Sequence, residues 1–297
     1  MAGRYESRYL RAVDPERPRG VWIRNTSHQR PGQAPTGALW CTVWDAEAGP
    51  PYAVKQSLPA PRSDWLAASA EAQGRSCAWE LRLESGAPGL RHLPRKWMYS
   101  APLPRTKLET EVPDARFSGW VQVGGARIDV VEWRGMVGHN WGAEHAERWV
   151  WLHAIAFPES PDTWLDVAIG RARVAGLTSP WIANGAIEVD GVRHQLGGLR
   201  RARVDAQPGS LALALQGHGV TVEATVSAPL DQTVAFVYAD PTGGEHHVLN
   251  CSVASVLMLV ERPGRPPLEL DTRHGGAYEL GMRETAHGIA LEPFPDP

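Results

Sequence analysis

The sequence has little cysteine and almost no lysine. Its three cysteines, Cys41, Cys77 and Cys251, lie far apart and form no CxxC spacing. This sparse, odd number excludes a disulfide-rich fold and indicates reduced, structural thiols, as is typical of the cytoplasm. The net charge is −3, and the few lysines and the arginines form no basic block. We therefore expect no nucleic-acid partner.

Long apolar runs are also lacking. Residues 1–20, MAGRYESRYLRAVDPERPRG, are polar and contain no apolar segment typical of a signal peptide. The longest apolar run, VASVLMLV, has the length of a single strand. We therefore expect no integral membrane segment and a cytoplasmic location.

Tryptophan, in contrast, is abundant, with 13 in 297 residues. This is more than a routine core requires, and it favours a large apolar or aromatic-lined cavity.

Two-residue periodicity dominates the chain. SCAWELRLES (76–85) alternates apolar and polar side chains, which predicts a half-buried strand. The segment 211–226 predicts a hairpin that turns at residues 217–219, and further hairpin turns are predicted at 124–125, 190–191 and 240–247. The best helix signal, SDWLAASAEAQG, predicts one short helix over 63–74.

These patterns predict an all-β fold class with few short helices. The number of strands exceeds one small barrel, and FPESPD (157–162) is the best internal boundary. We therefore expect two consecutive antiparallel β-barrels packed together, with domains at 1–157 and 158–297.

The segment MVGHNWGAEHAERWVWLHA (136–154) concentrates histidine, tryptophan and glutamate. If its two halves pair as a hairpin, alternation gathers five side chains on one face and places a turn with two polar residues above it. The face comprises His139, Trp141, Trp149, Trp151 and His153, and the turn carries Glu144 and His145.

Three interpretations of this segment stay open: a structural core, a metal site and a site of acid catalysis. The first is a structural core, because tryptophans on a strand are usually core and a buried histidine is usually a hydrogen-bonded structural residue. His139, Glu144, His145 and His153 are ligand types for a metal, but their spacing matches no HExxH signature. A serine hydrolase is not supported, because no GxSxG elbow occurs.

The third interpretation is acid catalysis in an apolar pocket. Loss of hydration raises the pKa of a carboxylic acid among tryptophans, so that such an acid can donate a proton near neutral pH. Glu144 is the candidate acid, while His139 and Asn140 would position water or a polar substrate group. The tryptophan faces would stabilise a carbocation. Such chemistry needs neither a cofactor nor a metal, and we expect none.

The stretches GMVGHNWG and WVWLHA resemble the lipocalin-like hydroxyneurosporene synthase (carotenoid 1,2-hydratase) superfamily, whose relatives include tocopherol cyclase-like and lipocalin-type Diels–Alderase proteins. YESRYLRAVDPERPRGVWIRNT, NCSVASVLMLVE and GGAYELG resemble an uncharacterised branch of it, so that the likeness spans most of the chain. The resemblance implies two lipocalin-like barrels and an apolar pocket that involves both. In hydratase-type members an acid tends to precede Asn-Trp-Gly, whereas this chain has His139 there.

Three further residues are candidates for the pocket. Trp22 and Arg24 share one face of a predicted strand, and Asn250 lies on another strand. Together with Trp141, His145, Trp149, Trp151 and His153 they form the predicted ligand-binding set.

The sequence thus predicts an enzyme that hydrates, cyclises or isomerises a hydrophobic, isoprenoid or polyketide-like small molecule. The alternative is a carrier that binds a lipid or another hydrophobic ligand without changing it. Formation of a homodimer stays open.

Overall fold

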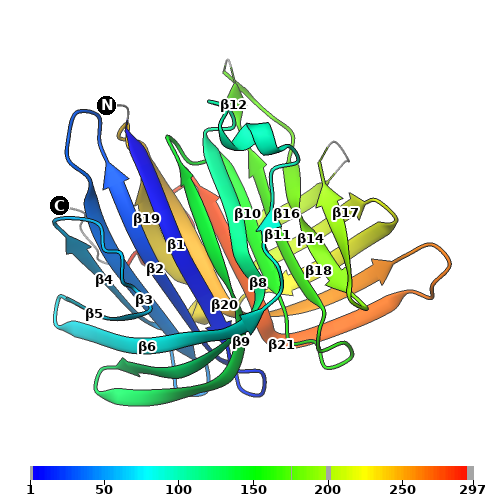
Figure 1. Cartoon of the computed structure of the whole chain (residues 1–297), viewed down its shortest axis with the longest axis horizontal. Coiled ribbons are helices and arrows are strands. Elements are labelled where there is room, and N and C mark those ends of the chain that lie inside the picture. Colours follow the sequence, from blue (N-terminus) through cyan, green and yellow to red (C-terminus); the bar gives the residue numbers. More distant parts are fainter. Residues whose placement is uncertain (1–2, 175, 199–201, 293–297) are drawn as a thin grey trace.

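The computed structural model describes residues 3–174, 176–198 and 202–292, and almost all of its regular structure is antiparallel β-sheet (Figure 1). The described part contains only two short 3-10 helices, Lys96–Tyr99 and Leu230–Gln232. The predicted all-β fold class is confirmed.

The first sheet has nine strands and comprises the first half of the chain. Its order is β4-β3-β2-β1-β9-β8-β6-β5, with β7 paired to β8. The strands are β1 (Arg4–Val13), β2 (Arg19–Gln29), β3 (Thr36–Asp45), β4 (Tyr52–Leu58), β5 (Ala67–Ala72), β6 (Arg75–Gly86), β7 (Leu90–Arg91), β8 (Thr106–Val123) and β9 (Ala126–Gly142).

The second sheet has ten strands in the order β15-β14-β11-β10-β21-β20-β18-β17-β16, with β19 paired to β20. Its strands are β10 (Arg148–Ala154), β11 (Trp164–Arg171), β14 (Ile182–Val189), β15 (Val192–Gly197), β16 (Arg203–Gln207), β17 (Ser210–Gly217), β18 (Val220–Ser227), β19 (Val234–Ala239), β20 (Glu245–Glu261) and β21 (Leu268–Met282). The short strands β12 (Arg173–Val174) and β13 (Leu177–Thr178) form a separate hairpin.

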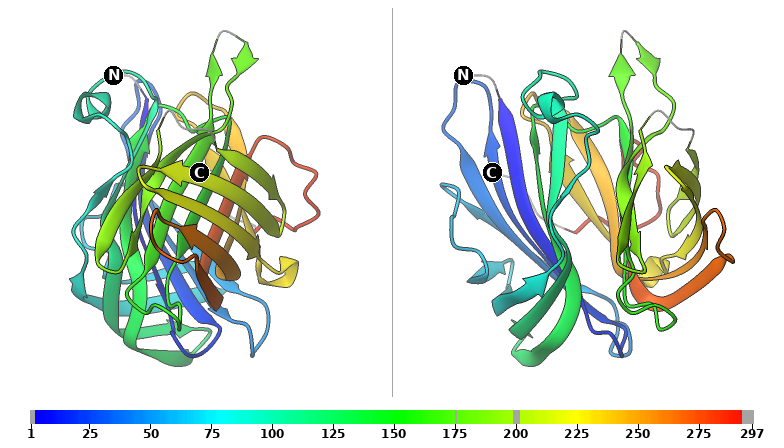
Figure 2. Two further views of the ribbon diagram at one scale, coloured as in Figure 1. Left: turned by 90° about the vertical axis from the view of Figure 1, so that its right-hand side faces the viewer. Right: turned by 45° about the vertical axis from the view of Figure 1, so that its right-hand side comes forward.

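Each sheet curls into a closed or nearly closed barrel, and the two barrels stand side by side (Figures 1 and 2). The second closes where Leu196 of β15 pairs with Gly217 of β17. The larger hydrophobic core fills the second barrel and extends to Trp22, Trp40 and Trp44 of the first sheet. Two lipocalin-like barrels packed together are thus present as predicted. The chain passes from one sheet to the other between β9 and β10, ahead of the domain boundary expected at residue 157.

The predicted hairpins are confirmed. Strands β8 and β9 turn at Gly124 and Gly125, β14 and β15 at Asp190 and Gly191, and β17 and β18 after Gly217. Asp190 and Gly191 both have positive φ, as a tight two-residue hairpin turn requires. The segment after Ala239 joins β19 to β20.

The helix predicted over 63–74 is wrong. This segment contains strand β5, which pairs with β6 through a turn at Gln73 and Gly74. Both turn residues have positive φ, which specifies a hairpin. Pairing with β6 and burial of Ala70 outweigh the local helix preference of alanine.

The hairpin predicted within 136–154 is also wrong. Strand β9 pairs with β1 and β8, whereas β10 pairs with β11 and β21. Both edges of each strand are therefore occupied, and residues 143–147 form the crossover between the two sheets. The single aromatic face built on that hairpin does not exist.

The three cysteines are free and buried, as predicted. Over the described ranges, no helix has the length and apolar character needed to cross a lipid bilayer.

Candidate active site

A cavity of about 730 Å³ lies between the two sheets. Its wall takes side chains from β1, β2, β8 and β9 of the first sheet and from β10, β11, β14, β19 and β21 of the second. It is mainly apolar, and a volume of this size suits a small organic molecule.

Six of the predicted site residues line this cavity. They are Trp22, Arg24, Asn140, His145, Trp149 and Trp151. The neighbours of Asn140 on β9 do not line the cavity, because side chains alternate between the two faces of a strand. Asn140 faces the cavity, so His139 and Trp141 face away and stack on one another. The same alternation places Trp149 and Trp151 on one face of β10, as expected.

Glu279 of β21 is a carboxyl group in the cavity wall, and sequence analysis missed it. Three neighbours hold it. Trp149 Nε1 donates to Oε1 at 2.9 Å, while Tyr238 Oη and Asn250 Nδ2 donate to Oε2, each at 3.3 Å. Burial raises the pKa of Tyr238 well above its ordinary value, so its hydroxyl keeps its proton at neutral pH. The carboxyl group is thus oriented by side chains of β10, β19 and β20.

Trp151 is held by a buried carboxylate. Its Nε1 donates to Asp166 Oδ1 at 3.0 Å, and Thr110 donates to Oδ2. Burial acts to raise the pKa of Asp166, but the neighbouring His92 and the hydrogen bonds lower it to about 2. The ring of Tyr9 meets that of Trp151 edge to face, with centroids 5.7 Å apart. These contacts fix the orientation of the Trp151 ring.

Arg24 places a buried positive charge in the wall. Its Nε donates to Ser7 Oγ at 2.6 Å, and its guanidinium carbon lies 3.9 Å from the centroid of the Tyr238 ring. The guanidinium NH1 atom is buried and has no hydrogen-bond partner among the described residues. The Oδ1 atom of Asn140 is likewise buried without a partner within the described part of the chain. Both groups can therefore bond to a polar atom of a ligand or to water.

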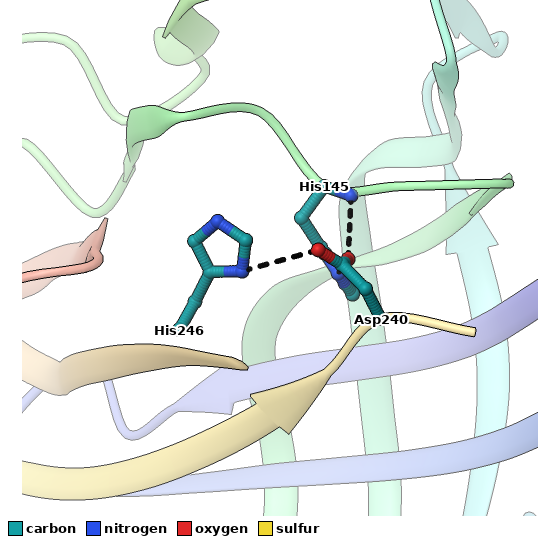
Figure 3. Close-up of side chains that lie close together, drawn as sticks. All are labelled: His145, Asp240 and His246. Atoms are coloured by element: carbon teal, nitrogen blue, oxygen red, sulfur yellow. Dashed lines mark hydrogen bonds and ion pairs between the residues drawn. The ribbon is translucent and has the colours of Figure 1, made fainter. Parts of the chain in front are cut away.

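His145 lies in the crossover between β9 and β10, where it contacts Asp240 and His246 (Figure 3). Its Nδ1 atom and its backbone N–H donate to Asp240 Oδ1 at 2.7 and 2.8 Å, and Asp240 Oδ2 lies 3.7 Å from His246 Nδ1. Burial lowers the pKa of His145, and it lowers that of His246 to about 4. Burial acts to raise the pKa of Asp240, but hydrogen bonds from His145 hold it below its usual value.

Glu144 is in a different environment from the one expected. It does not line the cavity; Arg105 pairs with Oε2, and Arg283 NH2 lies 3.7 Å from Oε1. The expected enclosure by tryptophans is therefore wrong, because the crossover that carries Glu144 runs past arginines at the partly exposed edge of the site. Its assignment as the acid stays a prediction.

Four more predicted residues lie outside the cavity wall. His139 bonds to Glu6 at 3.0 Å and stacks on Trp141. His153 is buried between the barrels, where it bonds to Arg11 and to the carbonyl of Pro113. Asn250 is buried behind Glu279 and orients it.

The metal ligand set considered from the sequence does not come together. Of His139, Glu144, His145 and His153, only His145 belongs to a group of potential ligands in the described structure, and the other members of that group are Asp240 and His246.

The residues that sequence analysis missed lie far along the chain from the aromatic segment. Asp240 and His246 belong to DPTGGEHH, which we interpreted only as a turn, and Glu279 to GGAYELG. Alternation places Glu279 and Ala277 on the same face of β21. Only the pairing of β10 with β21 brings that face beside Trp149.

Two further hollows exist near the barrels. One of about 120 Å³ adjoins the main cavity and shares Arg24, His145 and Tyr238 with it. The other, about 1000 Å³, lies along β16, β17, β18, β20 and β21 of the second sheet, and its lining includes the charged residues Arg203, Asp205 and Glu223. The cavity between the sheets is thus the larger of the two hollows at this site.

Fold and cavity define a two-barrel β protein with an aromatic-lined internal site. No family model matches the chain. It is similar to an uncharacterised protein of Mycobacterium tuberculosis, MT0513 in strain CDC 1551 / Oshkosh and Rv0493c in strain ATCC 25618 / H37Rv. Each is 29% identical over 309 residues, a match that covers 99% of this chain and 91% of the relative.

Solved structures share the fold. A structure of CghA with Sch210972 matches with a TM-score of 0.64 and 12% identity, over 94% of this chain and 88% of that one. An AttH-type protein (NE1406) of Nitrosomonas europaea matches with a TM-score of 0.52 and 15% identity, over 94% and 92% of the two chains. Kievitone hydratase of Nectria haematococca reaches 0.49 with 9% identity, over 97% and 90%. At these identities the likeness is one of fold.

Proposed function

We propose that this protein is an enzyme that hydrates, cyclises or isomerises a hydrophobic small molecule. The observation that carries the proposal is the cavity between the sheets, where one oriented carboxyl group, Glu279, is set in a wall of aromatic side chains. The structure of CghA with Sch210972 supports the binding of a small molecule on this fold, although fold alone does not fix a reaction.

Glu279 is the proton-transfer group in this proposal. A general acid or base must reach the reacting atom and be held in one geometry, and the bonds from Trp149, Tyr238 and Asn250 hold Glu279 in this way. Glu144, the acid expected from the sequence, pairs with Arg105 and Arg283 and does not line this cavity. The geometry therefore favours Glu279 over Glu144.

The aromatic wall supplies the second element of the mechanism. Protonation of an alkene places positive charge on carbon, and the faces of Trp22, Trp149 and Trp151 attract such a charge. The same rings exclude bulk water, so that only an ordered water or an internal nucleophile captures the cation.

The polar end of the cavity suits a substrate with at least one oxygen atom. Arg24 NH1 is a donor that lacks a partner among the described residues, and Asn140 Oδ1 is an acceptor that also lacks one there. A substrate carbonyl would accept from Arg24, and a substrate hydroxyl could also donate to Asn140, so that either group would place the alkene beside Glu279. An oxygenated isoprenoid or polyketide fits this arrangement.

The test is turnover by Glu279→Gln. We assay hydration, cyclisation and isomerisation of a panel of oxygenated isoprenoid and polyketide alkenes by mass spectrometry, and we measure their affinity separately. Gln keeps the shape of Glu279 and an oxygen that can accept from Trp149, but it cannot transfer a proton, so we expect turnover to fall by about 100-fold or more with affinity nearly unchanged. Glu144→Gln is the matched control and should keep its activity.

The opposite pattern, with activity lost in Glu144→Gln and kept in Glu279→Gln, would restore the assignment made from the sequence. Tight binding of a panel member without turnover by the wild type would instead support the carrier alternative, which an apolar cavity also allows.

A further inference from the structure

His145, Asp240 and His246 form a compact cluster beside the main cavity (Figure 3). They come from the crossover before β10, the end of β19 and the start of β20, so that three chain segments converge on one point. One potential ligand atom of each residue lies within 4.8 Å of those of the other two. All three side chains are buried: His145 is 7% exposed, Asp240 2% and His246 0%.

The cluster contains polar atoms that the described residues do not satisfy. His246 has no hydrogen-bond partner on either ring nitrogen, and His145 has none on Nε2, in the described part of the chain. Buried polar atoms almost always have a partner, because an unpaired one costs about 1–3 kcal/mol. Three unpaired nitrogens around one carboxylate therefore point to a ligand that accepts electron pairs from imidazole.

We propose that His145, Asp240 and His246 bind a divalent transition-metal ion of the Zn²⁺ type. Two imidazoles and one carboxylate are a ligand set that such ions prefer, and three protein ligands leave a coordination position for water or substrate. Each imidazole would bind the ion through one nitrogen, and a proton held by that nitrogen would be released to solvent.

The surroundings of the cluster fix the ligands in place. The ring of His145 lies between Tyr5 and Trp149, with centroids 4.1 and 5.5 Å away, and the backbone N–H of His145 holds Asp240. Metal sites commonly depend on such outer contacts to orient their ligands.

A guanidinium group lies close to the carboxylate of the cluster. Arg283 NH2 is 3.8 Å from Asp240 Oδ2, but the guanidinium group also pairs with Glu147 at 2.9 Å and with Glu144 at 3.7 Å. Its charge is thus compensated by two other carboxylates, and Asp240 keeps its Oδ1 side directed at His145.

This ligand set differs from the one considered from the sequence, and the proposal departs from our expectation of a site without metal or cofactor. It does not rest on the proposed function, because its test measures metal binding and not turnover.

The experiment is a Zn²⁺ titration of chelator-treated protein by calorimetry, with stoichiometry checked by native mass spectrometry. We expect one tight site in the wild type. His246→Gln and Asp240→Asn should each weaken it by more than about tenfold, since loss of even an outer contact costs this much. His247→Gln is the matched control. His247 is the next residue on β20, points to the opposite face and contacts His287, so Zn²⁺ affinity should be unchanged.

Loss of the site in His247→Gln with retention in His246→Gln would overturn the proposal and move the ion to the His247–His287 pair. Absence of stoichiometric binding by the wild type would also overturn it. Co²⁺ bound to the wild type gives a readout that needs no variant. We expect the visible absorption of a four- or five-coordinate ion with nitrogen ligands, and a spectrum identical to that of aqueous Co²⁺ would contradict the assignment.

Discussion

Trp149 connects the apolar wall of the site to its carboxyl group. Its ring lines the cavity and stacks near His145, while its Nε1 atom donates to Glu279. One side chain therefore shapes the space for the ligand and orients the group that we propose transfers the proton.

Trp149→Phe separates these two roles, because it keeps an aromatic ring and removes the donor. A hydrogen bond to a carboxyl group contributes about 1.5–3 kcal/mol. We therefore expect kcat to fall by about tenfold to 100-fold with little change in KM. Trp141→Phe is the control, since Trp141 stacks on His139 outside the cavity. An equal loss in both variants, or a change confined to KM, would show that the donor of Trp149 does not orient Glu279.

At the residue scale, sequence analysis succeeded where the chemistry is local. The alternation in WVWLHA correctly placed Trp149 and Trp151 on one face, and the Asn-Trp-Gly segment led to Asn140. It failed for Glu279, Asp240 and His246, because these residues reach the site only through strand pairing with distant parts of the chain. No local pattern distinguishes a glutamate in GGAYELG from an exposed one.

Strand β10 fits between β11 and β21 because small residues flank Trp149. In the register of the sheet Trp149 lies opposite Gly170 of β11 and Gly281 of β21. A Cβ atom on Gly281 would lie 2.1 Å from the Trp149 ring, whereas one on Gly170 would meet its nearest neighbour, Ala146, at 3.5 Å. The ring of Trp149 thus occupies the space over Gly281.

Gly281→Ala and Gly170→Ala form a matched pair of variants. We expect Gly281→Ala to lower the free energy of unfolding by about 1–3 kcal/mol, because the ring must move. Gly170→Ala makes an ordinary contact and should change the stability by less than about 1 kcal/mol. Urea denaturation of both variants gives this comparison. Equal stabilities would mean that the indole does not pack on Gly281.

At the scale of elements, alternation and turn residues predicted most strands and hairpins, since a strand's period and a positive-φ turn are local properties. The helix over 63–74 and the hairpin over 136–154 were wrong for one reason. In each case pairing with distant strands outweighed the local preference. The partner is β6 in the first case, and the partners are β1, β8, β11 and β21 in the second.

The two barrels are joined by a buried polar cluster. Arg11 of β1 donates to His153 Nδ1 of β10 at 3.1 Å and to the carbonyl of Ser252 in β20 at 2.8 Å. His153 Nε2 donates to the carbonyl of Pro113 at 2.9 Å. Because Arg11 can only donate and Pro113 can only accept, His153 must be neutral with its proton on Nε2.

The stability of the whole molecule should therefore depend on the titration of His153. Burial and then the charge of Arg11 lower its pKa from 6.5 to about 4. Between these values the unfolded chain binds the proton more readily than the folded one. The contribution of neutral His153 to the free energy of unfolding is therefore complete above pH 6.5. It is lost as the pH falls towards 4, by up to about 3 kcal/mol.

The check is denaturant unfolding across this pH range for the wild type and for His153→Gln. We expect His153→Gln to be less stable at every pH, but Gln takes up no proton in this range. The free energy of unfolding of the variant should therefore fall less steeply with decreasing pH. Groups that titrate in both proteins cancel in the comparison. Parallel pH profiles would mean that the pKa of His153 is not lowered.

We propose above all that the cavity between the barrels binds a hydrophobic molecule. The most direct measurement is fluorescence titration with cis-parinaric acid, a polyene probe, on two matched variants. Ala168 lines the cavity between the sheets, whereas Ala214 lines the hollow along β16–β18, β20 and β21, and both are half-buried strand residues. We predict saturable binding at one site in the wild type, its loss in Ala168→Trp and its retention in Ala214→Trp. Loss in Ala214→Trp alone, or no saturable binding by the wild type, would contradict the account.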